Sequence, residues 1–103
     1  MKLPREGFAA VCMKKRIYAV GGFAGKASGY QRSMERYNPK KNSWKKMPEM
    51  HVRRSGHAGV GINGRIYVFG GFDGDNDLSS MEIYNVKEAS WSKGGARLTG
   101  TPL

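Results

Sequence analysis

Cys12, His51 and His57 are the residues of this chain whose types could bind a metal ion or supply a nucleophile. A structural zinc site takes about four such ligands, and the chain has no second cysteine or third histidine to complete one. The histidines lie close together around the start of an expected strand. Cys12 aligns with Gly61, in the middle of an expected strand, where a small buried side chain fits. We therefore expect no metal site and no enzyme activity.

The glycines of Gly59-x-Gly61-x-x-Gly64 have the spacing of a dinucleotide-binding loop. That loop requires a strand before it and a helix after it, because the pyrophosphate sits at the helix N-terminus. Here a strand-like sequence begins at Arg65, so the context excludes the motif. A small-residue strand followed by a hairpin turn accounts for these glycines.

Asp73-x-Asp75-x-Asp77 resembles the start of a calcium-binding loop. The sixth position of such a loop needs Gly for its sharp turn, and the twelfth needs a bidentate Glu. Leu78 and Tyr84 occupy these positions. The sequence therefore predicts a solvated loop here, and no cofactor is expected anywhere in the chain.

An internal repeat sets the elements that position all these residues. Residues 16–23 (RIYAVGGF) recur as residues 65–72 (RIYVFGGF), and the Ser-Met-Glu stretch at 33–35 recurs at 80–82. The spacing is 49 positions from Gly21 to Gly70 and 47 positions from Trp44 to Trp91, so one loop differs in length by two residues. A period in this range is typical of stacked supersecondary units.

Each repeat divides into four short strands separated by turn residues. Asn63-Gly64 is the strongest hairpin signal, because a type I′ turn needs positive φ at both central residues. Lys14-Lys15 occupies the equivalent place with poorer turn chemistry. No helix of three turns is expected. The sequence predicts an all-β fold of two four-stranded antiparallel sheets, with strands at residues 7–13, 16–23, 32–38, 43–46, 56–62, 65–72, 81–84 and 90–92.

We expect one unit at residues 1–49 and a second at residues 50–93. Tyr37 and Trp44 recur as Tyr84 and Trp91, which favours packing of these rings in a core. After Trp91 the repeat pattern is lost, so residues 94–103 are expected to form a divergent, disordered tail.

The chain has 103 residues, one cysteine and a formal net charge of +10. A single cysteine suits a reducing compartment, and no apolar leader or membrane-length apolar run is visible, so we expect a cytoplasmic location and no membrane partner. Basic residues cluster at 14–16, 40–41, 45–46 and 53–54, near expected turns and strand ends. Solvated loop charge and a basic face that recruits an acidic partner both account for them. Nucleic acid is not an expected partner, because no binding module accompanies the charge.

A double glycine followed by spaced Tyr and Trp resembles the kelch repeat. The first copy has Gly21-Gly22 with Tyr37 and Trp44; the second has Gly70-Gly71 with Tyr84 and Trp91. The resemblance covers residues 1–93, and the Met-x-x-x-Arg-x-Gly lead-in and the Phe-Asp-Gly at 72–74 are most similar to the kelch domain of BTB–kelch proteins. It implies that each copy is one blade, and that the chain forms two four-stranded antiparallel kelch blades of an incomplete β-propeller.

The resemblance also implies a non-catalytic protein-binding module, like the substrate-recognition propeller of cullin-RING ubiquitin ligase adaptors, with a protein or acidic peptide as client. A cytoskeletal, actin-binding kelch module is the alternative, since the basic loops suit an acidic filament surface.

Arginines at the place of Arg5 and Arg54 often face an acidic peptide in proteins of that family, with bidentate contact from the planar fork. The other interpretation is that they are tied to backbone carbonyls or to a neighbouring loop. The loops at 24–31 and 73–78 are expected to rise on the same face, and loops on a rigid scaffold are where recognition usually occurs. They add four candidate protein-binding residues: Tyr30, Arg32, Asp75 and Asn76.

Two blades are few for a propeller. Closed propellers have about four to eight blades, and a pair leaves apolar sheet faces without a neighbour. We therefore expect either that the chain is part of a larger propeller or that copies self-associate head to tail. Three chains would supply a ring of about six blades.

Overall fold

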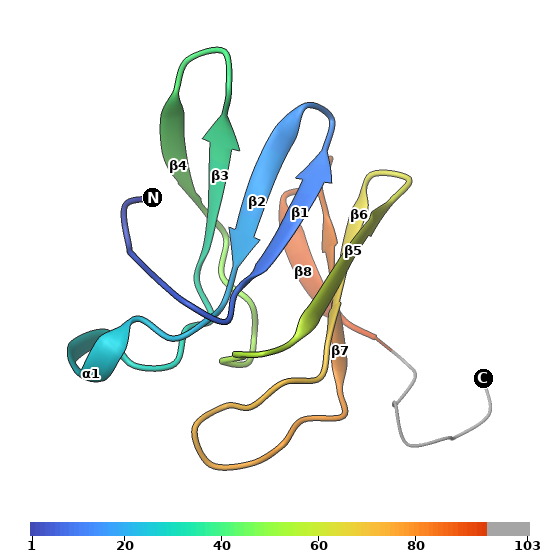
Figure 1. Cartoon of the computed structure of the whole chain (residues 1–103). Coiled ribbons are helices and arrows are strands. Elements are labelled where there is room, and N and C mark those ends of the chain that lie inside the picture. The colour runs from blue at the N-terminus through green and yellow to red at the C-terminus, as the bar shows by residue number, and fades with distance from the viewer. Residues whose placement is uncertain (95–103) are drawn as a thin grey trace.

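The computed structural model describes residues 1–94, which form two four-stranded antiparallel sheets standing side by side (Figure 1). In each sheet the strands are hydrogen-bonded in chain order. The first contains β1 (Ala9–Met13), β2 (Arg16–Val20), β3 (Met34–Asn38) and β4 (Ser43–Met47). The second contains β5 (Ala58–Ile62), β6 (Arg65–Phe69), β7 (Met81–Asn85) and β8 (Ser90–Lys93). The predicted all-β fold of two four-stranded sheets is confirmed. All but Gly94 of the expected disordered tail lies outside the described residues.

Strands β2 and β6 end earlier than predicted, because each glycine pair ends its strand. Gly21 and Gly22 have φ of 71° and 100°, which no extended strand residue adopts. The loop that follows in the first sheet contains the single turn of helix α1 (Gly25–Ser28), within the segment that is two residues longer than its counterpart. No helix among residues 1–94 is long and apolar enough to cross a membrane.

The two sheets pack through β1 and β5. Val11 and Met13 of β1 point at Gly59 and Gly61 of β5, where the absence of a side chain makes the close approach possible. A Cβ added at Gly61 would lie 2.6 Å from Met13 Cε and 2.9 Å from a Val11 methyl carbon. The core forms between the sheets, from Val11, Met13, Tyr18, Val20, Met34, Met50, Ile66, Val68 and Tyr84.

The outer face of the first sheet corrects two sequence expectations. Cys12 is exposed, although a buried side chain was expected. Tyr37 and Trp44 are half-buried, whereas Tyr84 is 1% exposed, as expected of a core residue. The reason is that the row through Cys12, Ile17, Tyr37 and Trp44 faces away from the second sheet, while the equivalent row through Tyr84 faces the first. Trp91, at the end of that second row, is also only half-buried.

The outer face of the second sheet is apolar and open. Val60 and Ile62 of β5 are 43% and 52% exposed. Their equivalents in β1, Val11 and Met13, are 4% and 8% exposed because they pack against β5. Each sheet therefore leaves one face uncovered by the residues that the structure describes.

Candidate functional site

Three segments meet at the end of the molecule opposite the β1–β2 and β3–β4 turns. They are the β2–β3 loop, the β6–β7 loop and the connection from β4 to β5 (Figure 1). Tyr30 links the two loops: its ring centroid lies 4.8 Å from that of Phe23 and 5.5 Å from that of Phe72. Its role in the structure is thus to pack the loops of neighbouring sheets against each other.

A polar cleft of about 250 Å³ lies where these segments meet. We call it the mixed-charge cleft, and it is lined by Arg32, His51, Val52, Arg53, Asp73 and Asp75. The structure thus brings together Arg32 and Asp75, two candidates that the sequence placed on the same face of the molecule. Tyr30 and Asn76 are nearby on the same loops but do not line the cleft.

Several charges of the cleft remain available to a partner. Arg32 Nη2 lies 3.6 Å from Glu49 Oε1, in a pair that is about half exposed and contributes little at such exposure. Arg53 and Asp75 are exposed and take part in none of the ion pairs within residues 1–94. The cleft can therefore offer cationic and anionic side chains to one ligand.

Asp73 shapes the β6–β7 loop. Its Oδ1 accepts hydrogen bonds from the backbone N–H groups of Asp75 and Asn76, both at 2.8 Å. Hydrogen bonds from Asn76 and then Asp75 hold the pKa of this carboxyl below its usual range, because they favour the ionised form. The carboxylate thus stays charged while it orders the loop that presents Asp75.

Arg54 is a structural residue, which corrects the expectation that its fork faces a peptide. Its side chain is fully buried, and its guanidinium makes five hydrogen bonds within the chain. The acceptors are the carbonyl oxygens of Gly70 and Ser80, the Ser80 hydroxyl and the Glu82 carboxylate. This matches the alternative that the arginines are tied to backbone carbonyls.

Arg5 repeats this arrangement in the first sheet. Its Nη1 donates to the carbonyl oxygens of Gly21 and Ser33, and its Nη2 lies 2.9 Å from Glu35 Oε2. The side chain is 1% exposed. The guanidinium groups of both arginines are therefore engaged within the chain.

Glu35 and Glu82 complete these clusters, and the sequence analysis did not single them out. Each carboxylate accepts from its arginine and from two successive backbone N–H groups: Lys2 and Leu3 at 2.6 and 3.1 Å for Glu35, and His51 and Val52 at the same two distances for Glu82. Recurrence of Ser-Met-Glu in both repeats was the available signal. A buried carboxylate would destabilise the fold if its oxygens lacked hydrogen bonds. Here the arginine and the backbone N–H groups supply them.

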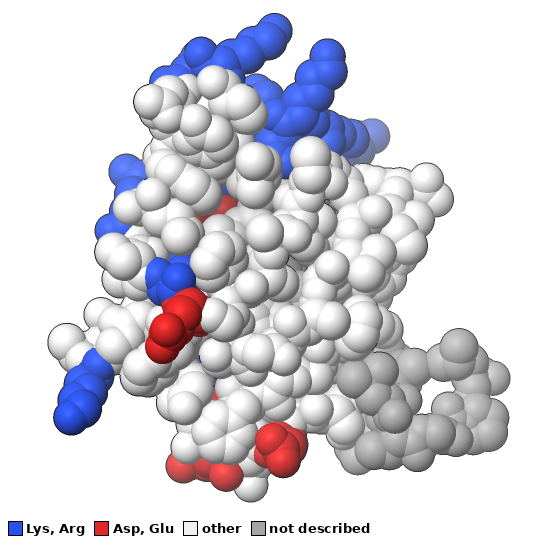
Figure 2. Space-filling model, viewed as in Figure 1, with Lys and Arg blue, Asp and Glu red and all other residues white. Residues whose placement is uncertain are grey.

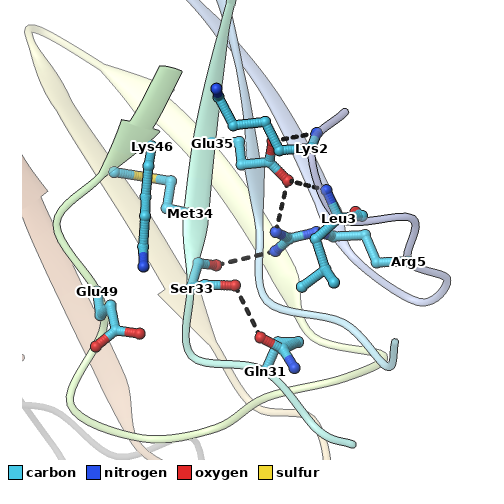
Figure 3. Close-up of a pocket in the computed structure, with 9 residues that line it drawn as sticks. All are labelled: Lys2, Leu3, Arg5, Gln31, Ser33, Met34, Glu35, Lys46 and Glu49. Carbon is cyan, nitrogen blue, oxygen red and sulfur yellow. Dashed lines mark hydrogen bonds and ion pairs between the residues drawn. The ribbon is translucent and has the colours of Figure 1, made fainter. Parts of the chain in front are cut away.

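A second pocket, of about 260 Å³, lies beside the Arg5 cluster (Figure 3). Arg5 and Glu35 form one wall, with Lys46 and Glu49 on the other side of the pocket. Because the Arg5 fork is occupied by Glu35 and two carbonyl oxygens, this wall presents few free donors. The pocket is a weaker candidate for recognition than the mixed-charge cleft.

His57 is packed between the sheets. Both ring nitrogens are buried without a geometrically good hydrogen-bond partner, and a Cβ at Gly21 would lie 2.7 Å from its Cε1. Burial lowers the pKa of His57 below 6.5, although the nearby Val20 carbonyl favours the protonated ring; the positive charge of Arg54 lowers the pKa further. His51 instead lies at the surface, with its Nδ1 3.0 Å from Glu82 Oε1.

Cys12, His51 and His57 are not brought together as a metal or nucleophile site. Within residues 1–94, no group of three His, Cys, Asp or Glu side chains has an arrangement that could hold a metal ion. What the structure assembles is a rigid pair of sheets with a charged, loop-built cleft.

The comparisons with known proteins agree with this architecture. A protein-family model described as Kelch motif matches the chain twice, at residues 4–51 and 53–95. Each match contains one of the two sheets and the segment that leads into it. A search of curated proteins gave no match.

Proposed function

This chain belongs to the kelch-repeat family, and from that premise we propose that it is a non-catalytic protein-binding module. The mixed-charge cleft carries the proposal, because segments of both blades meet there on rigid sheets. Loops held by such a scaffold are typical sites of recognition.

The chemistry of the cleft indicates the kind of client. Arg32 and Arg53 can bind carboxylates, and Asp75 can bind a lysine or arginine. A polypeptide segment with an acidic and a basic side chain close together would satisfy both signs of charge. Such a segment fits the sequence-derived expectation of an acidic peptide client, with the added requirement of a basic residue near the acidic one.

We also propose the finer role that the sequence suggested. In this proposal the chain acts in the cytoplasm as the client-recognition part of a cullin-RING ubiquitin ligase adaptor. Similarity of residues 50–56 and 72–74 to the BTB–kelch pattern supports it. Actin binding is the second candidate, and the formal net charge of +10 favours it, because the filament surface is acidic.

Screening a library of random 12-residue peptides tests the main proposal. We expect enrichment of peptides that carry both signs of charge, and a loss of affinity of about tenfold or more in the variant Arg32→Ala/Asp75→Ala. Lys26→Ala, on exposed helix α1, is the matched control and should bind normally. If the Arg32→Ala/Asp75→Ala variant binds the enriched peptides as tightly as the native chain does, the mixed-charge cleft is not the binding site. Filament co-sedimentation that survives the same variant would favour the actin-binding role.

Self-association is a further part of the proposal. The exposed Val60 and Ile62 of β5 correspond to side chains that the first blade buries against the second. A copy seated on this face would extend the stack head to tail, as closed rings of identical subunits do.

A further inference from the structure

The turns of the first blade carry an isolated group of positive charges. Lys14, Lys15 and Arg16 lie at the β1–β2 turn, and Lys40 and Lys41 lie at the β3–β4 turn. We call these five residues the basic tip surface. Figure 2 shows Lys and Arg side chains gathered at the end where both turns lie, with the visible acidic side chains lower on the molecule.

Among residues 1–94, no carboxylate forms an ion pair with this surface. All four ion pairs within residues 1–94 lie elsewhere and involve Arg5, Arg32, His51 and Arg54. Of the eight Asp and Glu residues, Glu88 is the one that lies at a hairpin turn, and that turn belongs to the second blade. The five cations therefore repel one another and produce a positive potential at this end.

The second blade shows that the fold does not require these charges. Asn63 and Gly64 replace Lys14 and Lys15, and Lys87 and Glu88 replace Lys40 and Lys41. At these four equivalent positions the first blade has four lysines and the second has no net charge. The two blades share the same strand order and the same turn positions.

The backbone of the β1–β2 turn strengthens this argument. Lys14 and Lys15 have φ of 50° and 62°, in the left-handed region that residues with a Cβ disfavour. Asn63 and Gly64 adopt φ of 50° and 76° in the equivalent β5–β6 turn, and both residue types tolerate this backbone conformation. The first blade thus holds two lysines in a strained conformation, and such strain concentrates at functional sites.

A groove of about 400 Å³ joins the two turns. Lys14, Lys15, Arg16 and Lys40 border it, and Cys12, Ile17 and Pro39 supply its less polar lining. Ile17 is 36% exposed, so an incoming apolar side chain can reach it. The groove therefore combines surrounding positive charge with an apolar surface.

We propose that the basic tip surface binds an acidic segment of a partner polypeptide, with carboxylates on the lysines and one apolar side chain in the groove. Nucleic acid fits less well, because no aromatic residue lines the groove and bases would have nothing to stack on. Four of the five cations are lysines, which act as point charges rather than as the planar forks favoured for phosphate.

This surface is separate from the mixed-charge cleft, so it goes beyond the proposed client site. One chain would engage a client at its loop end and an acidic partner at its turn end. The inference shares with the proposed function only the premise that the chain binds polypeptides.

Fluorescence anisotropy with a labelled peptide that has two glutamates on each side of a leucine tests the inference. The variant Lys14→Asn/Lys15→Gly/Lys41→Glu gives the first blade residues found at equivalent positions in the second. We expect it to bind the peptide at least about tenfold more weakly at low ionic strength, with the difference shrinking as salt is added. Replacing the peptide's leucine by serine should weaken binding by about fivefold.

The variant should unfold at the same or a higher temperature than the native chain, because its turn residues relieve strained φ angles. A loss of peptide binding is then not a loss of folding. The control Lys26→Glu/Lys93→Glu makes the same change in net charge at two exposed lysines that do not line the groove, and it should keep most of the affinity.

Equal losses in the two variants would show attraction by net charge alone and overturn the inference. Tighter binding of an oligothymidine of the same charge than of the peptide would overturn it in favour of nucleic acid. Binding of library peptides at the mixed-charge cleft, measured in the same variants, shows separately whether the proposed function stands.

Discussion

The Arg54 guanidinium uses all five of its N–H donors inside the protein, on Gly70, Ser80 and Glu82. Replacing it with alanine would leave the Glu82 carboxylate, which is 1% exposed, without its counter-charge. Breaking a buried pair in this way costs about 3–5 kcal/mol. We expect Arg54→Ala to lower the free energy of unfolding in urea by roughly that amount.

The neighbouring Arg53 provides the control for this change. It is exposed and forms none of the ion pairs within residues 1–94, so Arg53→Ala should alter stability by less than about 0.5 kcal/mol. If the two alanine variants unfold alike, the buried guanidinium is not a structural requirement.

His57 gives the fold a dependence on pH. Its pKa is lowered in the folded state by burial, so the unfolded chain takes up a proton first as the pH falls through about 6.5. The contribution of His57 to the free energy of unfolding is therefore complete above that pH and decreases progressively below it. Phe8 occupies the equivalent position in the first blade, which makes His57→Phe a conservative replacement.

As the pH is lowered from 7.5 to 5, we expect the Tm of the His57→Phe variant to fall by less than the Tm of the native chain. The difference between the two chains should be small at pH 7.5 and grow toward pH 5. Identical pH profiles would mean that another group causes the acid sensitivity.

At the residue scale, sequence could locate side chains but not their partners. The shared register of Arg5 and Arg54 was visible, yet it fits an arginine facing a ligand as well as one bonded to its own backbone. What decides between them is the place of the Gly70 and Ser80 carbonyl oxygens after the strands have paired. Asp75 and Arg32 likewise meet only because two blades pack together.

At the scale of elements, the β1–β2 turn is the clearest case of local strain. Lys15 has φ of 62°, and left-handed backbone costs a residue with a Cβ about 1–2 kcal/mol. Glycine removes that cost. It also makes the unfolded chain more flexible, which lowers the free energy of unfolding by up to about 1 kcal/mol. Lys15→Gly should therefore stabilise the chain by about 0.5–1 kcal/mol.

Gly64→Lys is the reciprocal test in the second blade. Nothing lies within 4 Å of a Cβ built at Gly64, so the cost of the change comes from its φ of 76° alone. Both variants can be compared by urea unfolding. The explanation fails if Gly64→Lys is neutral or if Lys15→Gly destabilises the chain.

Elements were the most predictable level of this molecule. The repeat, the turn residues and the short β-branched runs predicted all eight strands, because these signals are local in sequence. Strand ends were less accurate, since Gly21-Gly22 and Gly70-Gly71 stop the ladder earlier than the apolar pattern suggests. The exposure of Cys12 was missed because it depends on which face of the sheet has a neighbour.

For the whole molecule, the central feature is a stack of two blades, each with one face that residues 1–94 leave uncovered. Within the chain, Val11 and Met13 of one blade pack onto Gly59 and Gly61 of the next. A second copy joined head to tail would repeat this contact with Val60 and Ile62 against Ala10 and Cys12. The same geometry would be tighter there, because Ala10 and Cys12 have side chains where the internal contact has glycines.

This difference predicts opposite effects on self-association from two single changes. Ile62→Lys places a charge in the apolar contact and should keep the chain monomeric in sedimentation equilibrium, with little loss of stability because Ile62 is 52% exposed. Cys12→Gly restores the space found at Gly61, where a Cβ would lie 2.6 Å from Met13 Cε, and should strengthen association. A native chain that stays monomeric at every concentration, or a Cys12→Gly variant that associates no better, would show that copies of this chain do not stack as its own blades do.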